Sequence, residues 1–226
     1  MAKTNTMRPN KVRKKVVIVD DHPTIREGLA LCLEMEDDLE VCGHAADDVE
    51  ALQVIQNTRP DVVIVDVALK TGNGIELVKQ LVARNEPPAL LVWSMYDESL
   101  YAMRALRAGA LGYVNKQSDT PTVIEAIRKV LRGEIFLSAE ASIHLLTQAV
   151  RGKDLQLESP VHSLSDRELE IFQLIGHGRT TLQIADQLHL SPKTVESHRV
   201  RIKTKLDVTS ATELVQKATQ WVLENG

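Results

Sequence analysis

Short apolar runs alternate with amphipathic segments over the first 133 residues of the chain. The runs are rich in valine, isoleucine and leucine, which is typical of strands that are buried on both faces. The segments between them repeat apolar residues at helical spacing. We expect strands at 16–19, 40–43, 61–65, 89–93 and 112–114, and helices at 23–35, 47–58, 74–84, 99–108 and 119–132. This alternation predicts a doubly wound, five-stranded parallel sheet.

After Gly133 the alternation stops. One more helix is expected at 139–150, and the polar stretch 151–162 reads as a linker. From 163 onward the pattern is helical, with a capping box at Ser165 and Glu168. The expected helices are 165–175, 180–188, 191–206 and 210–223. Four short helices in succession predict a small all-α unit behind the sheet.

The second and third of these helices read as helix, turn, helix. Ser191 and Pro192 mark the turn as the cap and first position of the third helix. Apolar residues at helical spacing on both helices predict that the two helices pack against each other. In this contact, Ile184, Ala185 and Leu188 of the first would meet Val195, Ile202 and Leu206 of the second.

Composition narrows the class of protein. The 226 residues are 43% hydrophobic and 26% charged, which is ordinary for a globular protein and argues against general disorder. No run approaches the ~18 apolar residues of a membrane helix, and the basic start does not resemble a secretory signal. Two cysteines make no disulfide framework, so we expect a cytoplasmic protein. Aromatic residues, at 3%, argue against single-strand stacking on nucleic acid.

The net charge of −4 hides a segregation. Residues 1–15 hold six basic residues and no acid, whereas 16–150 hold 11 basic and 21 acidic residues. Residues 193–205 carry five basic residues and one acid. A local basic stretch can bind phosphates even in a neutral domain, although a solvated helix face explains the charge equally well.

Polar residues follow four of the predicted strands. Asp20 and Asp21 end the first, Asp66 ends the third, Ser94 follows the fourth and Lys116 follows the fifth. In the common strand order 2-1-3-4-5, these residues meet at one edge of the sheet. Three converging carboxylates favour Mg²⁺, and a carboxylate can attack phosphorus. Singly, each Asp reads as a helix cap and the Lys as a solvated side chain.

Residues 15–133 resemble a response-regulator receiver domain, which has the CheY-like, flavodoxin-like fold. The motifs are 19–22 (Val-Asp-Asp-His), Asp66 with Gly74 eight residues later, and 113–116 (Tyr-Val-Asn-Lys). The resemblance implies that Asp66 accepts a phosphoryl group, that Lys116 pairs with it, and that Ser94 and Tyr113 form a switch. The implied Mg²⁺ ligands are Asp20, Asp21, Asp66 and the carbonyl of Ala68. Lys70 departs from the pattern, since many receivers have Pro there.

The third helix of the C-terminal unit would present one face to a DNA major groove. We expect Glu196, Ser197 and Val200 to face base edges, with Glu196 accepting from a cytosine amino group. Phosphate contacts are expected from Lys193, Thr194, Arg201, Lys203 and Lys205. A helical dimerisation or scaffold module would show the same pattern of helices.

Residues 163–226 resemble the LuxR-type helix-turn-helix of the NarL/FixJ family. The matching stretches are 164–170, 183–185, 190–196, His198-Arg199 and Lys205-Leu206. The motif places His198 in the DNA-binding set. Thr181 departs from the family, which often has Asn there. The resemblance divides the chain into a tail (1–14), a receiver (15–133), a linker with a helix (134–162) and a DNA-binding domain (163–226).

The two resemblances together imply a two-component transcription regulator rather than an enzyme, although the receiver would catalyse its own phosphorylation and dephosphorylation. The implied partners are a histidine kinase, double-stranded DNA with paired half-sites and a second copy of the chain; RNA polymerase is left open, and no membrane is implied. Candidate dimer surfaces are 99–108, 122–132 and the last helix, at Leu214, Ala218, Trp221 and Val222. For the last helix, core packing is the alternative.

Two rival functions remain open. Haloacid-dehalogenase-like phosphohydrolases also use an Asp nucleophile with Mg²⁺, but they need a second Asp two residues later, where this chain has Ala68. The other rival is a receiver that never takes up phosphate and acts as a constitutive DNA-bound dimer.

Overall fold

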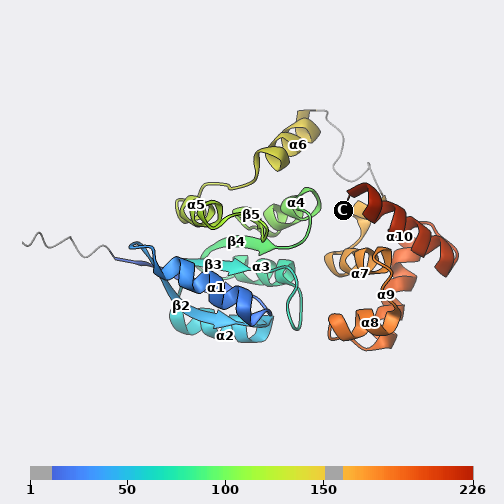
Figure 1. Cartoon of the computed structure of the whole chain (residues 1–226), viewed down its shortest axis with the longest axis horizontal. Coiled ribbons are helices and arrows are strands. Elements are labelled where there is room, and N and C mark those ends of the chain that lie inside the picture. Colours follow the sequence, from blue (N-terminus) through green and yellow to red (C-terminus); the bar gives the residue numbers. More distant parts are fainter. Residues whose placement is uncertain (1–11, 151–159, 226) are drawn as a thin grey trace, which may run out of the picture.

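The computed structural model describes residues 12–150 and 160–225. Most of the expected N-terminal tail and residues 151–159 of the expected linker lie outside the described residues. The first part forms a five-stranded parallel sheet in the order β2-β1-β3-β4-β5, as predicted (Figure 1). The strands are β1 (Lys14–Val19), β2 (Leu39–Ala45), β3 (Val62–Val65), β4 (Ala89–Ser94) and β5 (Gly112–Asn115).

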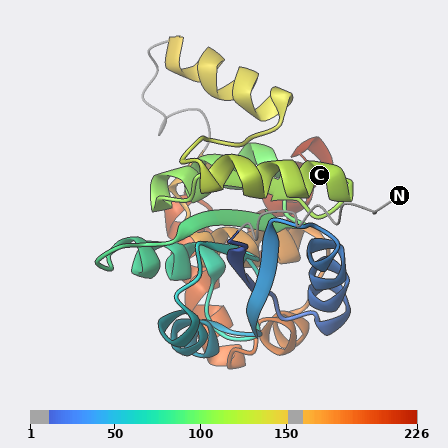
Figure 2. The same ribbon diagram turned by 90° about the vertical axis from the view of Figure 1, so that its left-hand side faces the viewer.

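Helices cover both faces of this sheet (Figure 2). They are α1 (Pro23–Glu34), α2 (Asp48–Thr58), α3 (Gly74–Val82), α4 (Glu98–Ala108) and α5 (Thr120–Leu131). Alternate residues of β1 divide between the two layers: Val16 and Ile18 pack with α1 and α5, whereas Val17 and Val19 pack with α2, α3 and α4. The central strands are therefore apolar on both faces, which explains their continuous runs of valine and isoleucine.

The helix starts follow local chemistry. Asp47, Asn73, Asp97 and Asp119 each cap a helix by accepting a backbone N–H with the side chain. In α2 the apolar spacing also suggests a buried Val49, but that side chain is 61% exposed, and Ala51 and Ile55 fill the core instead.

Strand register brings the carboxyl ends together. Val19 pairs with Val65, and Val65 pairs with Val92 one strand further on. Ser94 in turn lies beside Asn115, just before Lys116. The residues that follow these strands therefore share one edge of the sheet.

The C-terminal part is helical. Its elements are α6 (Ala139–Val150), the 3₁₀ turn η1 (Pro160–Ser163), α7 (Asp166–Gly176), α8 (Thr181–Gln187), α9 (Pro192–Lys205) and α10 (Ala211–Asn225). The predicted capping box at Ser165 and Glu168 is present. The apolar residues that were expected to join α8 to α9 are all buried.

The last helix differs from one expectation. Leu214 and Ala218 are fully buried in the core of the helical unit, so they cannot form a dimer surface. Trp221 is partly buried and packs on Phe172 of α7, at 5.9 Å between ring centroids. Core packing, the alternative weighed above, accounts for these three residues.

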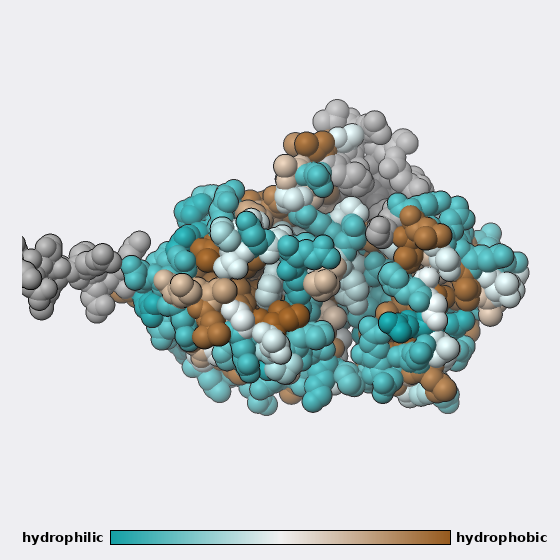
Figure 3. Space-filling model, in the orientation of Figure 1, coloured by the Kyte–Doolittle hydropathy of each residue, from teal (hydrophilic) through white to brown (hydrophobic). Residues whose placement is uncertain are grey.

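The visible surface is mostly hydrophilic with scattered apolar patches (Figure 3). Exposed large apolar side chains include Leu31 and Met35 on and after α1, and Ile143 and Leu146 on α6. Within the described ranges, no helix has both the length and the apolar character needed to cross a membrane.

Candidate functional site

Four residues with ligand atoms gather at the carboxyl edge of the sheet. Asp20, Asp21, His22 and Asp66 each offer one such atom, and these atoms lie within 4.8 Å of one another. Asp20 and Asp66 are buried, whereas Asp21 is half-buried and His22 exposed. Strand pairing explains the convergence, because the Asp66 N–H donates to the Val19 carbonyl at 2.8 Å. The three carboxylates expected to converge therefore do so.

Lys116 reaches the same cluster from the end of β5. Its Nζ lies 2.5 Å from Asp66 Oδ2 and 2.6 Å from Asp20 Oδ2, and its side chain is only 3% exposed. Burial alone would lower the pKa of Lys116, but Asp66 and Asp20 outweigh burial and raise it. The ammonium thus stays protonated between the two acids.

The donor set fits a hard divalent cation. Asp20 Oδ2 and Asp21 Oδ1 are buried and accept no well-directed hydrogen bond, although Lys116 Nζ and His22 Nδ1 lie within ion-pair distance of them. Carboxylate oxygens with spare acceptor capacity are the ligands Mg²⁺ prefers. Burial raises the pKa of Asp66, against the opposing effects of Lys116 and Ser94. The Ala68 N–H donates to Asp66 Oδ1 at 3.4 Å, so the loop residue implied as a carbonyl ligand lies beside the acid.

Gly74 explains the spacing of eight residues after Asp66. A Cβ at this position would collide with the Asp66 backbone carbonyl. The first residue of α3 therefore packs directly under the backbone of the acidic residue, and its N–H donates to Val67 at 2.8 Å. Only glycine permits this approach without moving one of the two backbones.

Ser94 and Tyr113 adjoin the acid cluster. The Ser94 side chain lies close to both Asp66 and Tyr113, where it opposes the rise in pKa that burial causes in each of them. Tyr113 is fully buried, with its ring inside the protein, and its hydroxyl donates to the Tyr96 carbonyl at 2.7 Å. The two residues implied as a switch thus lie close together beside the acid, with the aromatic ring inward.

A second polar network, which the sequence did not suggest, joins the loop after β4 to α7. The Tyr96 hydroxyl donates to Glu170 Oε1 at 2.9 Å, and the Tyr101 hydroxyl donates to Gln173 at 3.2 Å. The two rings stack at 4.8 Å. Glu170 is 1% exposed and also accepts from Arg167 at 2.6 Å. Burial raises the pKa of Glu170 despite this partner. All three tyrosines of the chain therefore lie between the acid cluster and α7.

Ion pairs flank this network. Arg104 of α4 donates to Asp166 Oδ1 and to the Leu164 carbonyl, both at 2.9 Å. Lys79 of α3 lies 3.4 Å from Asp166 Oδ2. Helix α7 consequently docks on α3 and α4 (Figure 1). This contact covers part of the expected dimer surface at 99–108.

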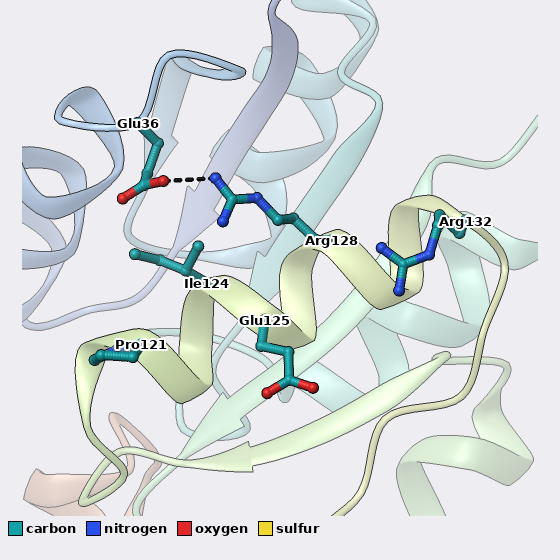
Figure 4. Close-up of a pocket in the computed structure, with 6 residues that line it drawn as sticks. All are labelled: Glu36, Pro121, Ile124, Glu125, Arg128 and Arg132. Carbon is teal, nitrogen blue, oxygen red and sulfur yellow. Dashed lines mark hydrogen bonds and ion pairs between the residues drawn. The ribbon is translucent and has the colours of Figure 1, made fainter.

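The other expected dimer surface stays open. A shallow pocket lies along α5, lined by Glu36, Pro121, Ile124, Glu125, Arg128 and Arg132 (Figure 4). On one side of this pocket, Arg128 of α5 forms ion pairs with Glu36 at 2.5 Å and with Asp38 at 2.7 Å.

Helix α9 keeps its expected reading face free of the receiver. Of the side chains expected to contact DNA, six are exposed, namely Lys193, Glu196, Ser197, Val200, Arg201 and Lys205. The other three, Thr194, His198 and Lys203, are half-buried. Glu196 accepts a hydrogen bond from the Thr181 hydroxyl at 2.7 Å. Burial and the nearby Arg201 lower the pKa of His198.

Lys205 has a structural partner. Its Nζ lies 2.6 Å from the buried carboxylate of Glu168 and 3.1 Å from the Ser163 carbonyl. Burial by itself would raise the pKa of Glu168, but Lys205 and the Ser165 backbone lower it overall. The ammonium expected to meet DNA phosphates is thus already paired within the domain.

Comparison with known proteins now identifies the two halves. Residues 16–128 match the response regulator receiver domain, and residues 162–218 match the luxR family of bacterial regulatory proteins. Among curated relatives, the oxygen regulatory protein NreC of Staphylococcus carnosus (strain TM300) is 38% identical over 208 residues. The match covers 90% of this chain and 96% of that protein. The chain belongs to the LuxR-type (NarL/FixJ) family of two-component response regulators.

Solved structures of such regulators share the fold. The response regulator ChrA of a heme-sensing two-component system is 30% identical, with a TM-score of 0.51 over 93% of this chain and 98% of that one. The response regulator RcsB, solved in complex with DNA, is 25% identical, with a TM-score of 0.55 over 90% and 96% of the two chains. As a member of the LuxR-type family, the chain is a transcription regulator that consists of a CheY-like receiver followed by a helix-turn-helix domain.

Proposed function

We propose that a histidine kinase phosphorylates this response regulator on Asp66, and that phosphorylation controls sequence-specific DNA binding by α9. The observation that carries the proposal is the contact of Lys116 with both Asp20 and Asp66 at the edge of the sheet. No simple helix cap needs a buried lysine between two buried acids.

The chemistry follows from the positions of the groups. An oxygen of the Asp66 carboxylate attacks phosphorus, the bond from phosphorus to the donor breaks, and an acyl phosphate remains. Lys116 pairs with one phosphoryl oxygen, and the Ser94 hydroxyl donates to another. Asp20, Asp21, Asp66 and the Ala68 carbonyl would hold Mg²⁺, whose positive charge would favour the ionised acid and neutralise the phosphoryl group.

The same residues suggest how the signal reaches the DNA-binding half. Ser94 adjoins Tyr113, the Tyr113 hydroxyl donates to the Tyr96 carbonyl, and the Tyr96 hydroxyl donates to Glu170 of α7. When Ser94 turns to a phosphoryl oxygen, the surroundings of the Tyr113 hydroxyl change. We infer that this biases the docked α7 toward release, a shift between two conformations of the chain.

Dimerisation completes the proposal. Since α7 covers part of α4, the surface at 122–132 on α5 is the better placed of the two receiver surfaces for a second copy (Figure 4). Two copies would present two α9 helices to paired half-sites in DNA. In this arrangement residues 15–133 receive the signal and residues 163–226 read DNA.

Phosphate incorporation tests the central step. The full chain is incubated with radiolabelled acetyl phosphate and Mg²⁺, and bound phosphate is counted per chain. We expect at most one stable phosphate per chain, and none in Asp66→Asn. Repeated turnover of a phosphomonoester would instead favour a phosphohydrolase.

DNA binding tests the second step. We expect the phosphorylated chain to bind its selected duplex more tightly than the unphosphorylated chain at fixed salt. Equal affinity in both states would favour a DNA-bound dimer that acts independently of phosphate.

A further inference from the structure

Glu196 is the one acid in the basic stretch 193–205. Its side chain is 57% exposed on α9, the helix proposed to enter the major groove. Because DNA phosphates repel a carboxylate, an acid at this place is unfavourable unless it faces an amino group on a base edge. The contacts that orient the Glu196 carboxylate toward a base edge therefore matter for its role.

Two groups converge on one oxygen of this carboxylate. The Thr181 hydroxyl donates to Glu196 Oε1 at 2.7 Å, and Arg199 Nε lies 3.6 Å from the same atom. Thr181 begins α8, so this bond crosses the turn between the two helices. Both contacts use Oε1, and Oε2 keeps its capacity to accept a hydrogen bond from a ligand.

Fixing the side chain in advance matters energetically. A free glutamate loses rotamer freedom when it binds a base, and that loss weakens the contact. A side chain already held by Thr181 loses less on binding. A fixed carboxylate also tolerates fewer alternative bases, since it cannot turn toward another donor.

We propose that Thr181 is a positioning residue for sequence readout. Its hydroxyl holds Glu196 so that the second carboxylate oxygen accepts from the exocyclic amino group of a cytosine, at one base pair of each half-site. The inference rests on the proposed function and deepens it by assigning one specificity contact.

The competing explanation is that Thr181 only fastens α8 to α9. The buried contacts of Ile184 and Ala185 with Val195 already join these helices. The Thr181 bond lies at the exposed rim of that contact, so its loss should change folding stability little. Sequence preference is therefore the readout that separates positioning from fastening.

The test uses the full chain with Mg²⁺ and acetyl phosphate. Random duplex DNA is enriched by the wild type, and each position of the selected site is then replaced in turn to measure relative affinity. The variants are Thr181→Val, Thr181→Ser, Glu196→Ala and, as a matched control, Thr212→Val at an exposed threonine of α10. Thermal unfolding of each variant is measured in parallel.

We expect the wild type to prefer cytosine at one position on the order of tenfold or more, and Glu196→Ala to lose that preference. Thr181→Val should reduce the preference about two- to tenfold without lowering the unfolding temperature. Thr181→Ser, which keeps the hydroxyl, should retain the preference, and so should Thr212→Val.

Other outcomes overturn the inference. If Glu196→Ala loses the preference but Thr181→Val keeps it in full, the assignment to Thr181 is wrong while the proposed function stands. If Thr181→Val weakens binding to all sequences equally and flattens the salt dependence, the hydroxyl contacts phosphate instead. If the wild type enriches no sequence, the proposed function fails together with the inference.

Discussion

Tyr96→Phe is expected to loosen the docking of α7 on the receiver while leaving both halves folded. The substitution removes a single hydroxyl, which donates to Glu170 at 2.9 Å across the contact between the halves. The ring, which stacks on Tyr101 at 4.8 Å, is retained. The effect therefore falls on the contact and not on the core of either half.

The magnitude follows from the burial of the acceptor. Glu170 is 1% exposed, and Arg167 also donates a hydrogen bond to it. A hydrogen bond to a charged group contributes about 1.5–3 kcal/mol. Because every 1.4 kcal/mol is a factor of ten, the equilibrium between docked and released forms should shift about 10- to 150-fold.

Backbone ¹⁵N relaxation along a series of low urea concentrations measures this shift. Docked halves tumble with one rotational correlation time, whereas released halves tumble with two shorter ones. We expect Tyr96→Phe to separate the two correlation times at a lower urea concentration than the wild type does. Arg104→Ala, which removes bonds to Asp166 and Leu164, should act in the same direction.

A double-mutant cycle with Glu170→Gln shows whether the hydroxyl and the carboxylate act on each other. The combined variant should then cost less than the sum of the two single changes. If Tyr96→Phe and Glu170→Gln each leave the urea dependence of tumbling unchanged, the contact does not stabilise the docked form, and the proposed route to the DNA-binding half is wrong.

Four further predictions concern stability, DNA binding and the phosphorylation site. Lys205→Ala should lower the free energy of unfolding of the helical half by about 1–3 kcal/mol, because it leaves Glu168 buried without its cation, and denaturation measures this. Lys203→Ala should instead weaken binding to every DNA sequence and lower the salt slope by about one; the reverse pattern would exchange the two roles. The pKa of Glu168 is lower in the folded protein than in the unfolded chain, where it is about 4.3. Ionised Glu168 therefore contributes fully to the free energy of unfolding above the unfolded pKa, and this contribution is lost as the pH falls through the folded pKa. Glu168→Gln should thus flatten the dependence of the free energy of unfolding on pH in that acid range. Gly74→Ala should abolish phosphate uptake, because its methyl group displaces the Asp66 backbone; normal labelling of a folded Gly74→Ala would contradict the packing argument.

Local patterns predicted most of the fold, since each strand and helix is encoded by its own residues. The continuous apolar strands followed by acids implied both the parallel sheet and the edge where Asp20 and Asp66 meet. The side of α2 that faces the sheet is less predictable: Val49 is exposed, because helical spacing alone cannot tell which of two neighbouring apolar stripes is buried.

The docking of α7 could not be predicted in the same way. Tyr96 and Glu170 are 74 residues apart, and their contact depends on how two separately folded units meet. The sequence does carry one signal, because acids and a glutamine lie among the apolar residues of α7. In the structure three of these polar residues, Glu168, Glu170 and Gln173, are buried. A helix with polar residues on every side and few solvated positions needs polar partners from another element.

The two tryptophans of the chain are divided between its halves. The Trp93 ring lies 5.5 Å from Lys116 Nζ, beside the acid cluster, whereas Trp221 rests against Phe172 in the helical half. Fluorescence from the first indole should respond to a cation or phosphoryl group that moves the ammonium, and the second should respond to unfolding of the helical half. The protein thus carries a natural optical probe in each half, and single Trp→Phe variants would let the two events be timed separately without any attached dye.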